Sequence, residues 1–388
     1  MLITGTGRLA PIGLAPWGIL IEDGRISWLG SPDEAPSSPD RIDLGGELVT
    51  PGLVDSHTHP VFAGDRSDEA AARLEGVPYG EGGILRTVRA TRAADEATLE
   101  RLVESRLRAA LAAGTTTVEC KSGYGLSLEE ELRHLRIIGR VAERLPLRVV
   151  RTFLGAHAVP PEATSAAAHA ADVADRMIPA VAAEGAADFV DAFCDAGFFD
   201  LAATERIGRA ASDAGLGLRL HAEQLARTGA TELGIRLGAA SVDHLEQLDD
   251  EGVAALAGSE TVATLLPAPA TVLRDRLPPA RALIDAGGRV ALASDANAGT
   301  YSGFGTMPLV IGLGATLLRM TAGEALTAAT AGGADALRRS ELGRLEVGAA
   351  ADLVAWDTDH EGAFALRLGA LQPRRIWIGG KEVEAPHG

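Results

Sequence analysis

Residues 115–157 have the sequence TTTVECKSGYGLSLEEELRHLRIIGRVAERLPLRVVRTFLGAH. This stretch predicts a strand over 115–123, a helix over 127–145 and a second strand over 148–157. Ser127 with Glu130 three residues later is a capping-box pattern, which marks the start of the helix. A strand, a helix and a strand in this order predict one βα unit with parallel strands.

The same alternation continues on both sides of this unit. Upstream, we expect a strand over 48–59 and a helix over 97–114, which ends at Gly114, a residue that commonly follows a helix end. Downstream, we expect helices over 165–185, 204–215 and 227–238 and strands over 187–195, 216–224, 240–246, 261–268 and 289–297. Because the strands are apolar and no G-x-G-x-x-G follows the first, the pattern favours an α/β TIM-type (β/α)8 barrel over an open Rossmann sheet.

Both ends of the chain have a different pattern. Residues 18–30 alternate apolar and polar side chains around Asp23-Gly24, a hairpin signal. Residues 350–359 and 374–384 are also strand-like, the second with a Gly-Gly turn. We therefore predict a small β-sandwich module from residues 1–50 and 345–388 and a barrel over 51–344.

Composition excludes several classes of function. The chain has 388 residues and a formal net charge of −17, which argues against binding nucleic acid. It has no apolar run of about 18 residues, so we expect no membrane span. The N-terminus lacks a signal-peptide pattern, and two cysteines, Cys120 and Cys194, are too few for a disulfide framework. We expect a cytoplasmic protein with reduced thiols.

Histidines gather at the predicted ends of strands. Five of the nine lie there, and the active sites of barrels of this type lie at the carboxyl ends of the strands. His57 and His59 are two residues apart, which places both on one face of a strand. Predicted strands five, six and eight end at His221, His244 and Asp295. Together with His57 and His59, these residues form a convergent set that can hold one metal ion.

These motifs carry a resemblance to a known family. Residues 57–66 (HTHPVFAGDR), 119–126 (ECKSGYGL), 152–160 (TFLGAHAVP), 221–225 (HAEQL) and 294–300 (SDANAGT) resemble the imidazolonepropionases of the amidohydrolase superfamily, and the resemblance covers nearly the whole chain. It implies hydrolysis of 4-imidazolone-5-propanoate to N-formimidoyl-L-glutamate in histidine degradation. It also implies a possible homodimer and one divalent or trivalent metal, zinc or iron, with the ligands His57, His59, His221 and Asp295.

The resemblance also implies the residues that contact the substrate. Arg66 matches the family's substrate arginine, and its guanidinium can hold the propanoate carboxylate through paired hydrogen bonds. At Gly299, we expect the absence of a side chain to let a backbone N–H approach the ligand closely. The full implied substrate-binding set is Arg66, Tyr124, His157, Gln224, Asn297, Gly299 and Thr300.

The expected mechanism uses one metal ion. The metal acidifies a water molecule, Asp295 takes its proton, and His244 polarises the ring carbonyl or stabilises the oxyanion. Gln224 cannot act as a general base. The predicted fourth strand contains no lysine, since Lys121 is on the second strand and Lys381 is outside the barrel, so a carbamate-bridged metal pair is not expected.

Two other functions fit the sequence less well. A cyclic deaminase acting on a purine or pyrimidine often has Glu three residues after the strand-five histidine, whereas this chain has Gln224, and Arg66 favours a substrate with a carboxylate. A non-catalytic barrel scaffold typically loses metal ligands, and all four are present here. One departure from the family is Ala298, which replaces the usual proline.

Overall fold

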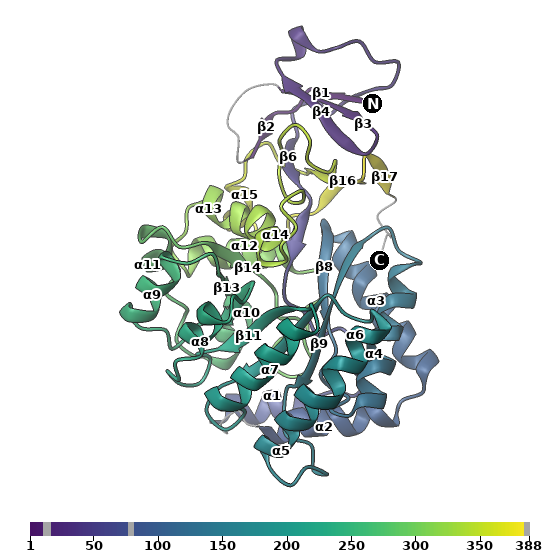
Figure 1. Ribbon diagram of the computed structural model, residues 1–388. Helices are drawn as coiled ribbons and strands as arrows, with labels where there is room; N and C mark the ends of the chain where they lie inside the picture. Colours follow the sequence, from purple (N-terminus) through teal and green to yellow (C-terminus); the bar gives the residue numbers. More distant parts are fainter. Residues whose placement is uncertain (11–16, 77–80, 384–388) are drawn as a thin grey trace.

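A computed structural model describes residues 1–10, 17–76 and 81–383 (Figure 1). Residues 384–388, where the predicted C-terminal strand and module end, lie outside the described residues. Figure 1 shows a small β-rich part, built from both chain ends, above a larger part in which helices surround strands. None of the helices in the described ranges is long and apolar enough to cross a membrane.

The larger part is the predicted barrel. Its eight-stranded sheet has the order β14-β13-β12-β11-β10-β9-β8-β7, and all neighbouring strands are parallel. The strands are β7 (Leu53–Asp55), β8 (Thr115–Lys121), β9 (Arg148–Ala156), β10 (Phe189–Cys194), β11 (Gly217–Ala222), β12 (Ser241–His244), β13 (Val262–Leu265) and β14 (Val290–Leu292). The prediction of eight parallel strands is confirmed.

The barrel closes just beyond the ends of its first and last strands. A parallel bridge joins Thr58 to Ala296. The N–H of His59 donates to the carbonyl of Ala296 at 2.9 Å, and the N–H of Asp295 donates to the carbonyl of His57 at 3.0 Å. The backbone contacts that close the barrel therefore bring His57, His59 and Asp295 together.

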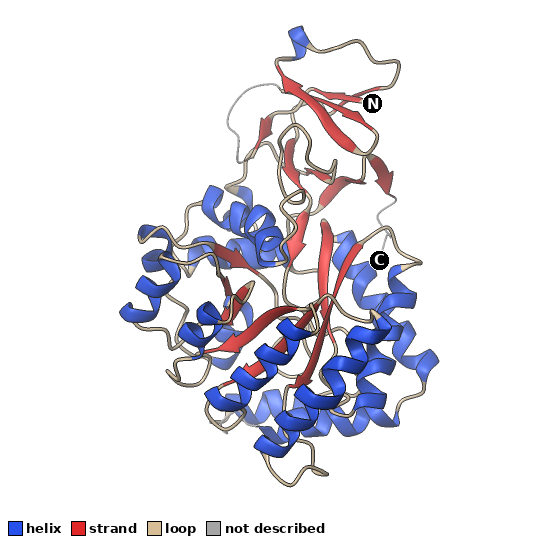
Figure 2. Cartoon of the chain, viewed as in Figure 1, coloured by secondary structure: helices blue, strands red, loops and turns tan. Residues whose placement is uncertain are grey.

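Helices cover the outside of the strands (Figure 2). The α-helices of the barrel are α1 (Ser67–Leu74), α2 (Glu81–Ala93), α3 (Glu96–Ala112), α4 (Leu128–Ala142), α5 (Ala166–Asp172), α6 (Ile178–Glu184), α7 (Leu201–Asp213), α8 (Ala230–Arg236), α9 (Asp250–Ala257), α10 (Pro267–Leu273), α11 (Ala280–Asp285), α12 (Met307–Thr316), α13 (Ala322–Thr327) and α14 (Gly333–Ala336). Two short π-helical segments connect helices of this set: Val173–Met177 lies between α5 and α6, and Ala328–Gly332 lies between α13 and α14. The remaining short helices are Pro32–Glu34 and α15 (Ala363–Leu366).

The start of α4 follows only half of the predicted capping box. The Ser127 hydroxyl accepts a hydrogen bond from the N–H of Glu130. The Glu130 carboxylate instead pairs with Arg133, with Oε2 2.9 Å from Nη1. An arginine one turn further along the helix thus engages the carboxylate that would complete the box.

Two sheets form the smaller part. One has the order β4-β3-β1-β5 and the other β17-β16-β15-β6-β2. Their strands are β1 (Leu2–Thr4), β2 (Arg8–Leu9), β3 (Gly18–Glu22), β4 (Arg25–Gly30), β5 (Arg41–Asp43), β6 (Leu48–Pro51), β15 (Leu353–Trp356), β16 (Pro373–Ile378) and β17 (Lys381–Val383). Apolar side chains from both ends of the chain, among them Ile19, Val49 and Trp377, pack into one core.

The single strand predicted over 48–59 is wrong. It is divided into β6, which pairs with β15 in the small part, and β7, which pairs with β8 in the barrel. At Gly52, between them, a Cβ would lie 2.0 Å from Oγ1 of Thr116. Glycine therefore lets the chain pass close to β8 as it moves between sheets. The predicted division at residue 50 falls inside β6, and the domain boundaries stay a prediction.

His134 in α4 predicts a pH dependence of stability. Its side chain is fully buried, and neither ring nitrogen has a hydrogen-bond partner. Burial lowers its pKa from 6.5 to about 3. The unfolded chain therefore binds a proton between these pH values that the folded chain does not, so stability falls as the pH drops below 6.5, by about 1.4 kcal/mol per pH unit at most.

The measurement is urea unfolding of the wild type and of His134→Leu between pH 3.5 and 8. We expect a shallower loss of unfolding free energy below pH 6.5 in the variant. His360→Leu removes an exposed histidine and serves as the control. Equal slopes for the wild type and His134→Leu would contradict the burial argument.

Candidate active site

Three predicted ligands converge where the barrel closes. Nε2 of His57 lies 3.2 Å from Nε2 of His59 and 3.6 Å from Oδ1 of Asp295. Nε2 of His59 lies 3.5 Å from the same oxygen. All three side chains are at most 5 % exposed. Two imidazoles and a carboxylate thus face one point in the interior.

Two further histidines join this cluster. His57, His221 and His244 form a second group in which the potential ligand atoms lie within 4.8 Å of one another. The rings of His57 and His221 have centroids 4.6 Å apart. The four predicted ligands are therefore divided between two groups that share His57. The second group also contains His244, which is not one of the predicted ligands.

The donor set fits a metal ion. Ligand nitrogens and oxygens at about 2.0–2.1 Å from one tetrahedral ion lie roughly 3.3 Å apart, which is close to the distances found here. Burial lowers the pKa of both His57 and His59 well below the ordinary value, and nearby cationic groups contribute. Both rings are therefore neutral, the state in which imidazole binds a metal.

Buried carboxylates hold the opposite nitrogens of two of these rings. Nδ1 of His57 lies 2.7 Å from Oδ2 of Asp243, and Nδ1 of His221 lies 3.1 Å from Oδ2 of Asp191. Such contacts fix the orientation of a ring and leave Nε2 free for a ligand.

His244 differs from His57 and His59 in its electrostatics. Burial by itself would lower its pKa, but Glu246, whose Oε1 is 3.5 Å from Nδ1, and Asp295 outweigh this and raise the pKa to about 9. An imidazolium at this position can donate a proton or a hydrogen bond.

Unusual backbone conformations occur where the strands end. His244, the last residue of β12, has φ of 87°, Leu245 after it has φ of 71°, and Asp295, after β14, has φ of 46°. These values lie in the left-handed region, which non-glycine residues rarely adopt and which costs of order 1–3 kcal/mol each. Such strain is often found where a side chain is aimed at a reaction centre.

Most of the predicted substrate-binding residues line one small cavity beside the cluster. Tyr124 and His157 lie next to each other there, with ring centroids 5.2 Å apart, and His157 stacks on His59 at 5.1 Å. Nδ1 of His157 is 2.9 Å from the carbonyl of Gly123. The cavity is lined by His59, Arg66, Ile84, Tyr124, His157, Phe193, His221, Gln224, His244, Asp295, Asn297 and Thr300.

Arg66 reaches this cavity while held by a carboxylate. Its Nε donates to Oε2 of Glu69 at 2.9 Å, and its Nη2 donates to Oε1 at 2.6 Å. Arg73 also donates to Glu69, at 3.0 Å, and to the carbonyl of Gly299, at 2.8 Å. One edge of the Arg66 guanidinium is thus engaged by the protein, which fixes its orientation.

The structure gives a different reason for glycine at position 299. The Gly299 N–H donates to Oδ1 of Asn297 at 2.7 Å, so this N–H stabilises the loop after β14. Asn297 also accepts from the N–H of Thr300 and donates to Oγ1 of Thr300, which organises the turn after β14. A Cβ on Gly299 would lie 2.1 Å from Nη1 of Arg66. Glycine therefore makes room for the guanidinium.

Gly299→Ala is expected to displace Arg66 and raise KM about tenfold, because the added methyl group occupies the space of Nη1. Steady-state kinetics with the proposed substrate, described below, measure this effect. Gly323→Ala is the matched control, since a Cβ there meets no atom within 4 Å. An unchanged KM for Gly299→Ala would show that the guanidinium needs no such space.

Comparison with known proteins agrees with this geometry. Residues 48–383 match the amidohydrolase family. The chain is 47% identical to Imidazolonepropionase of Mycolicibacterium smegmatis, over 92% of this chain and 89% of that protein. It is 48% identical to Imidazolonepropionase of Ectopseudomonas mendocina, over 92% of this chain and 91% of that protein. The chain belongs to the imidazolonepropionase family of amidohydrolases.

Solved structures with low sequence identity share the amidohydrolase fold. The 5-methylcytosine deaminase of Klebsiella pneumoniae has a TM-score of 0.80 at 16% identity, covering 99% of this chain and 98% of its own. A zinc-bound adenosine deaminase of Xanthomonas campestris has a TM-score of 0.75 at 20% identity, covering 98% and 92%. Family membership and the His/Asp cluster make this chain a metal-dependent hydrolase of a cyclic amide C–N bond.

Sequence reasoning missed the buried charges behind the predicted metal ligands. These are Glu119, Lys121, Asp191, Arg219, Asp243 and Glu246, each at most 2 % exposed. A signal was present, because most of these residues lie inside otherwise apolar strands, where a charge needs a partner. The sequence alone did not show which partner each one has.

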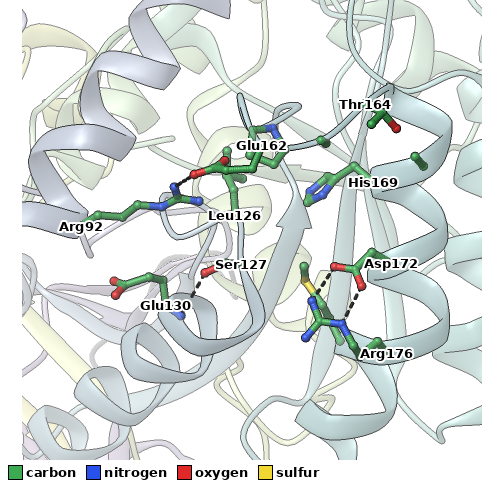
Figure 3. A pocket seen from close by; sticks show the side chains of 13 residues that line it. Arg92, Leu126, Ser127, Glu130, Glu162, Thr164, His169, Asp172 and Arg176 are labelled. Carbon is green, nitrogen blue, oxygen red and sulfur yellow. Dashed lines mark hydrogen bonds and ion pairs between the residues drawn. The ribbon is translucent and has the colours of Figure 1, made fainter.

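A larger groove lies elsewhere, between α2, α4 and α5 (Figure 3). Two ion pairs lie along it: Arg92 lies 2.6 Å from Glu162, and Arg176 lies 2.6 Å from Asp172. None of the predicted site residues lines it. The groove is therefore separate from the cavity beside the His/Asp cluster. Both cysteines, Cys120 and Cys194, are buried and unpaired, as expected.

Proposed function

We propose that this chain opens the ring of 4-imidazolone-5-propanoate with water at the His/Asp cluster, giving N-formimidoyl-L-glutamate. The observation that carries the proposal is that Arg66 lines the same small cavity as three of the four proposed metal ligands, His59, His221 and Asp295. A substrate with a carboxylate on one side and a reactive ring carbonyl on the other matches this pairing. The names of the curated relatives support the same reaction.

Different residues of the cavity contact different parts of the substrate in this proposal. Arg66, whose guanidinium is oriented by Glu69, holds the propanoate carboxylate. Tyr124 and His157 contact the ring, and Thr300, fixed by Asn297, contributes a hydroxyl at the wall. These contacts place the ring carbonyl next to the ligand cluster.

The chemical step needs a proton acceptor and a stabilised oxyanion. A metal ion held by His57, His59, His221 and Asp295 would polarise the carbonyl and acidify a water molecule. Asp295 accepts the proton of the attacking water and returns it to the ring nitrogen that leaves. His244 donates a hydrogen bond to the oxyanion that forms on the carbonyl.

Gln224 distinguishes this site from that of a cyclic deaminase. Its side chain lines the cavity, and its backbone N–H is fixed by Asp195 at 2.7 Å. An amide cannot shuttle protons, so Gln224 binds substrate and leaves the acid–base steps to Asp295 and His244.

We further propose the identity of the metal, the oligomeric state and the location of the protein. Zinc suits a set of imidazoles with one carboxylate, and iron is also compatible. The homodimer, the location in the cytoplasm and the lack of nucleic-acid binding stay as predicted from the sequence.

The test is to follow the ultraviolet absorbance of freshly prepared 4-imidazolone-5-propanoate with the purified protein. We expect rapid loss of the substrate signal, its suppression by a chelator, and its return when zinc or iron is added back. A protein that contains metal but leaves the substrate untouched would overturn the proposed reaction.

A further inference from the structure

Lys121 is an unusual residue in this chain. Only two of the 36 basic residues are lysines, Lys121 and Lys381, and the rest are arginines. Lys121 lies at the end of β8 and is fully buried. Lysine at a buried position in so arginine-rich a chain indicates that the site needs a compact ammonium, which arginine cannot replace.

The ammonium of Lys121 lies between two buried carboxylates. Nζ is 2.9 Å from Oε1 of Glu119 and 2.8 Å from Oδ2 of Asp191, and none of the three side chains is exposed. Removing one partner from such a buried group leaves uncompensated charge, which is strongly unfavourable. Loss of the Lys121 ammonium would leave the carboxylates of Glu119 and Asp191 buried without their shared positive partner.

Each carboxylate leads to a different metal-binding segment. Oδ2 of Asp191 lies 3.1 Å from Nδ1 of His221. Oε2 of Glu119 accepts from the N–H of Thr58 at 3.2 Å. Thr58 lies between His57 and His59, and its hydroxyl also donates to the carbonyl of Glu119 at 2.7 Å.

A similar buried ion pair lies beside Nδ1 of His57. Nη2 of Arg219 donates to Oδ2 of Asp243 at 2.9 Å, and that oxygen is 2.7 Å from Nδ1 of His57. Arg219 is also held by the carbonyls of Ser56 and Ala336. Arg219 thus supports one ring through one carboxylate, whereas Lys121 reaches two segments through two.

We propose that Lys121 is a positioning residue of the metal centre, whose ammonium fixes the His57–His59 segment through Glu119 and fixes His221 through Asp191. The inference rests on the proposed ligand set. Lys121 itself touches neither substrate nor reacting atoms. Its effect therefore appears first in the affinity of the site for metal, because groups that orient ligands typically change that affinity by 10- to 100-fold.

The experiment measures metal affinity without reference to turnover. Metal-free wild type and Lys121→Met compete for Zn²⁺ with a coloured chelator, and the dissociation constant is read from the chelator's absorbance. We expect Lys121→Met to bind Zn²⁺ about 10- to 100-fold more weakly. Lys121→Arg should not restore binding, because the larger guanidinium has no room in a fully buried site.

The matched control removes a partly buried ion pair. Arg148 pairs with the buried Asp352 at 2.6 Å, away from the cluster. Arg148→Met should lower the thermal midpoint but leave the affinity for Zn²⁺ unchanged. This control separates loss of stability from loss of ligand positioning.

A double variant tests the route through Asp191. If Lys121 acts through that carboxylate, Lys121→Met combined with Asp191→Asn should lose less than the product of the two single effects. If Lys121→Met does not fold, Asp191→Asn and Glu119→Gln alone still test the account, since each should weaken Zn²⁺ binding.

The results separate this inference from the proposed function. A wild type that binds Zn²⁺ but does not hydrolyse the substrate would overturn the reaction and leave the role of Lys121 standing. A folded Lys121→Met that binds Zn²⁺ as tightly as the wild type, or unchanged affinity in Asp191→Asn and Glu119→Gln, would overturn the role of Lys121.

Discussion

Asp295→Asn is expected to reduce kcat by about 10³-fold. The amide keeps the size of the side chain but can neither accept the proton of the attacking water nor supply the negative charge that lies 3.5–3.6 Å from Nε2 of His57 and His59. General acid–base groups typically contribute 10²- to 10⁴-fold to the rate. The measurement is kcat by loss of substrate absorbance, with the protein's metal content determined in the same samples.

Asp285→Asn is the matched control for this variant. Asp285 is an exposed carboxylate of α11 that pairs with Arg281, and its replacement should leave kcat unchanged. If Asp295→Asn kept near-normal kcat at full metal content, another group would have to take the proton, and the role given to Asp295 would be wrong.

Arg66→Met is expected to lower kcat/KM about 10²-fold, mainly through KM. Hydrogen bonds to charged groups contribute about 1.5–3 kcal/mol each, and 1.4 kcal/mol corresponds to a factor of ten. Because the propanoate is bound in both the ground state and the transition state, loss of its contact with Arg66 affects KM more than kcat. Initial rates over a range of substrate concentrations separate the two constants.

Two comparisons make this prediction specific. Arg86→Met removes an exposed arginine of α2 that pairs with Asp68, and it should leave KM unchanged. An imidazolone without the propanoate group should be a poor substrate for the wild type and no poorer for Arg66→Met. If Arg66→Met lost the same factor with both substrates, Arg66 would support the site in general and would not bind the carboxylate.

Local patterns were sufficient to predict the barrel and the ends of its strands. The alternation of strands and helices, and helix starts such as Ser127, depend on residues close together in the sequence. Placing His57, His221 and Asp295 at strand ends was enough to predict one cluster, because the carboxyl ends of parallel strands meet at one face of a barrel.

Contacts across the fold could not be predicted in this way. His57 is held by Asp243, 186 residues away, and the contact depends on the register of β11 and β12, in which His221 lies opposite Asp243. The clash between a Cβ at Gly299 and Arg66 depends on side-chain positions in two separate loops. The division of residues 48–59 at Gly52 depends on β8 passing beside it. Each of these features needs the packed barrel.

The most direct test of the account is the identity of the product. Mass spectrometry of 4-imidazolone-5-propanoate treated with the metal-containing protein, with ammonia measured in the same reaction, distinguishes ring opening from deamination. The account predicts a product heavier than the substrate by one water molecule, identical to N-formimidoyl-L-glutamate, with no ammonia released in the enzymatic step. Stoichiometric ammonia, or recovery of unchanged substrate, would contradict it.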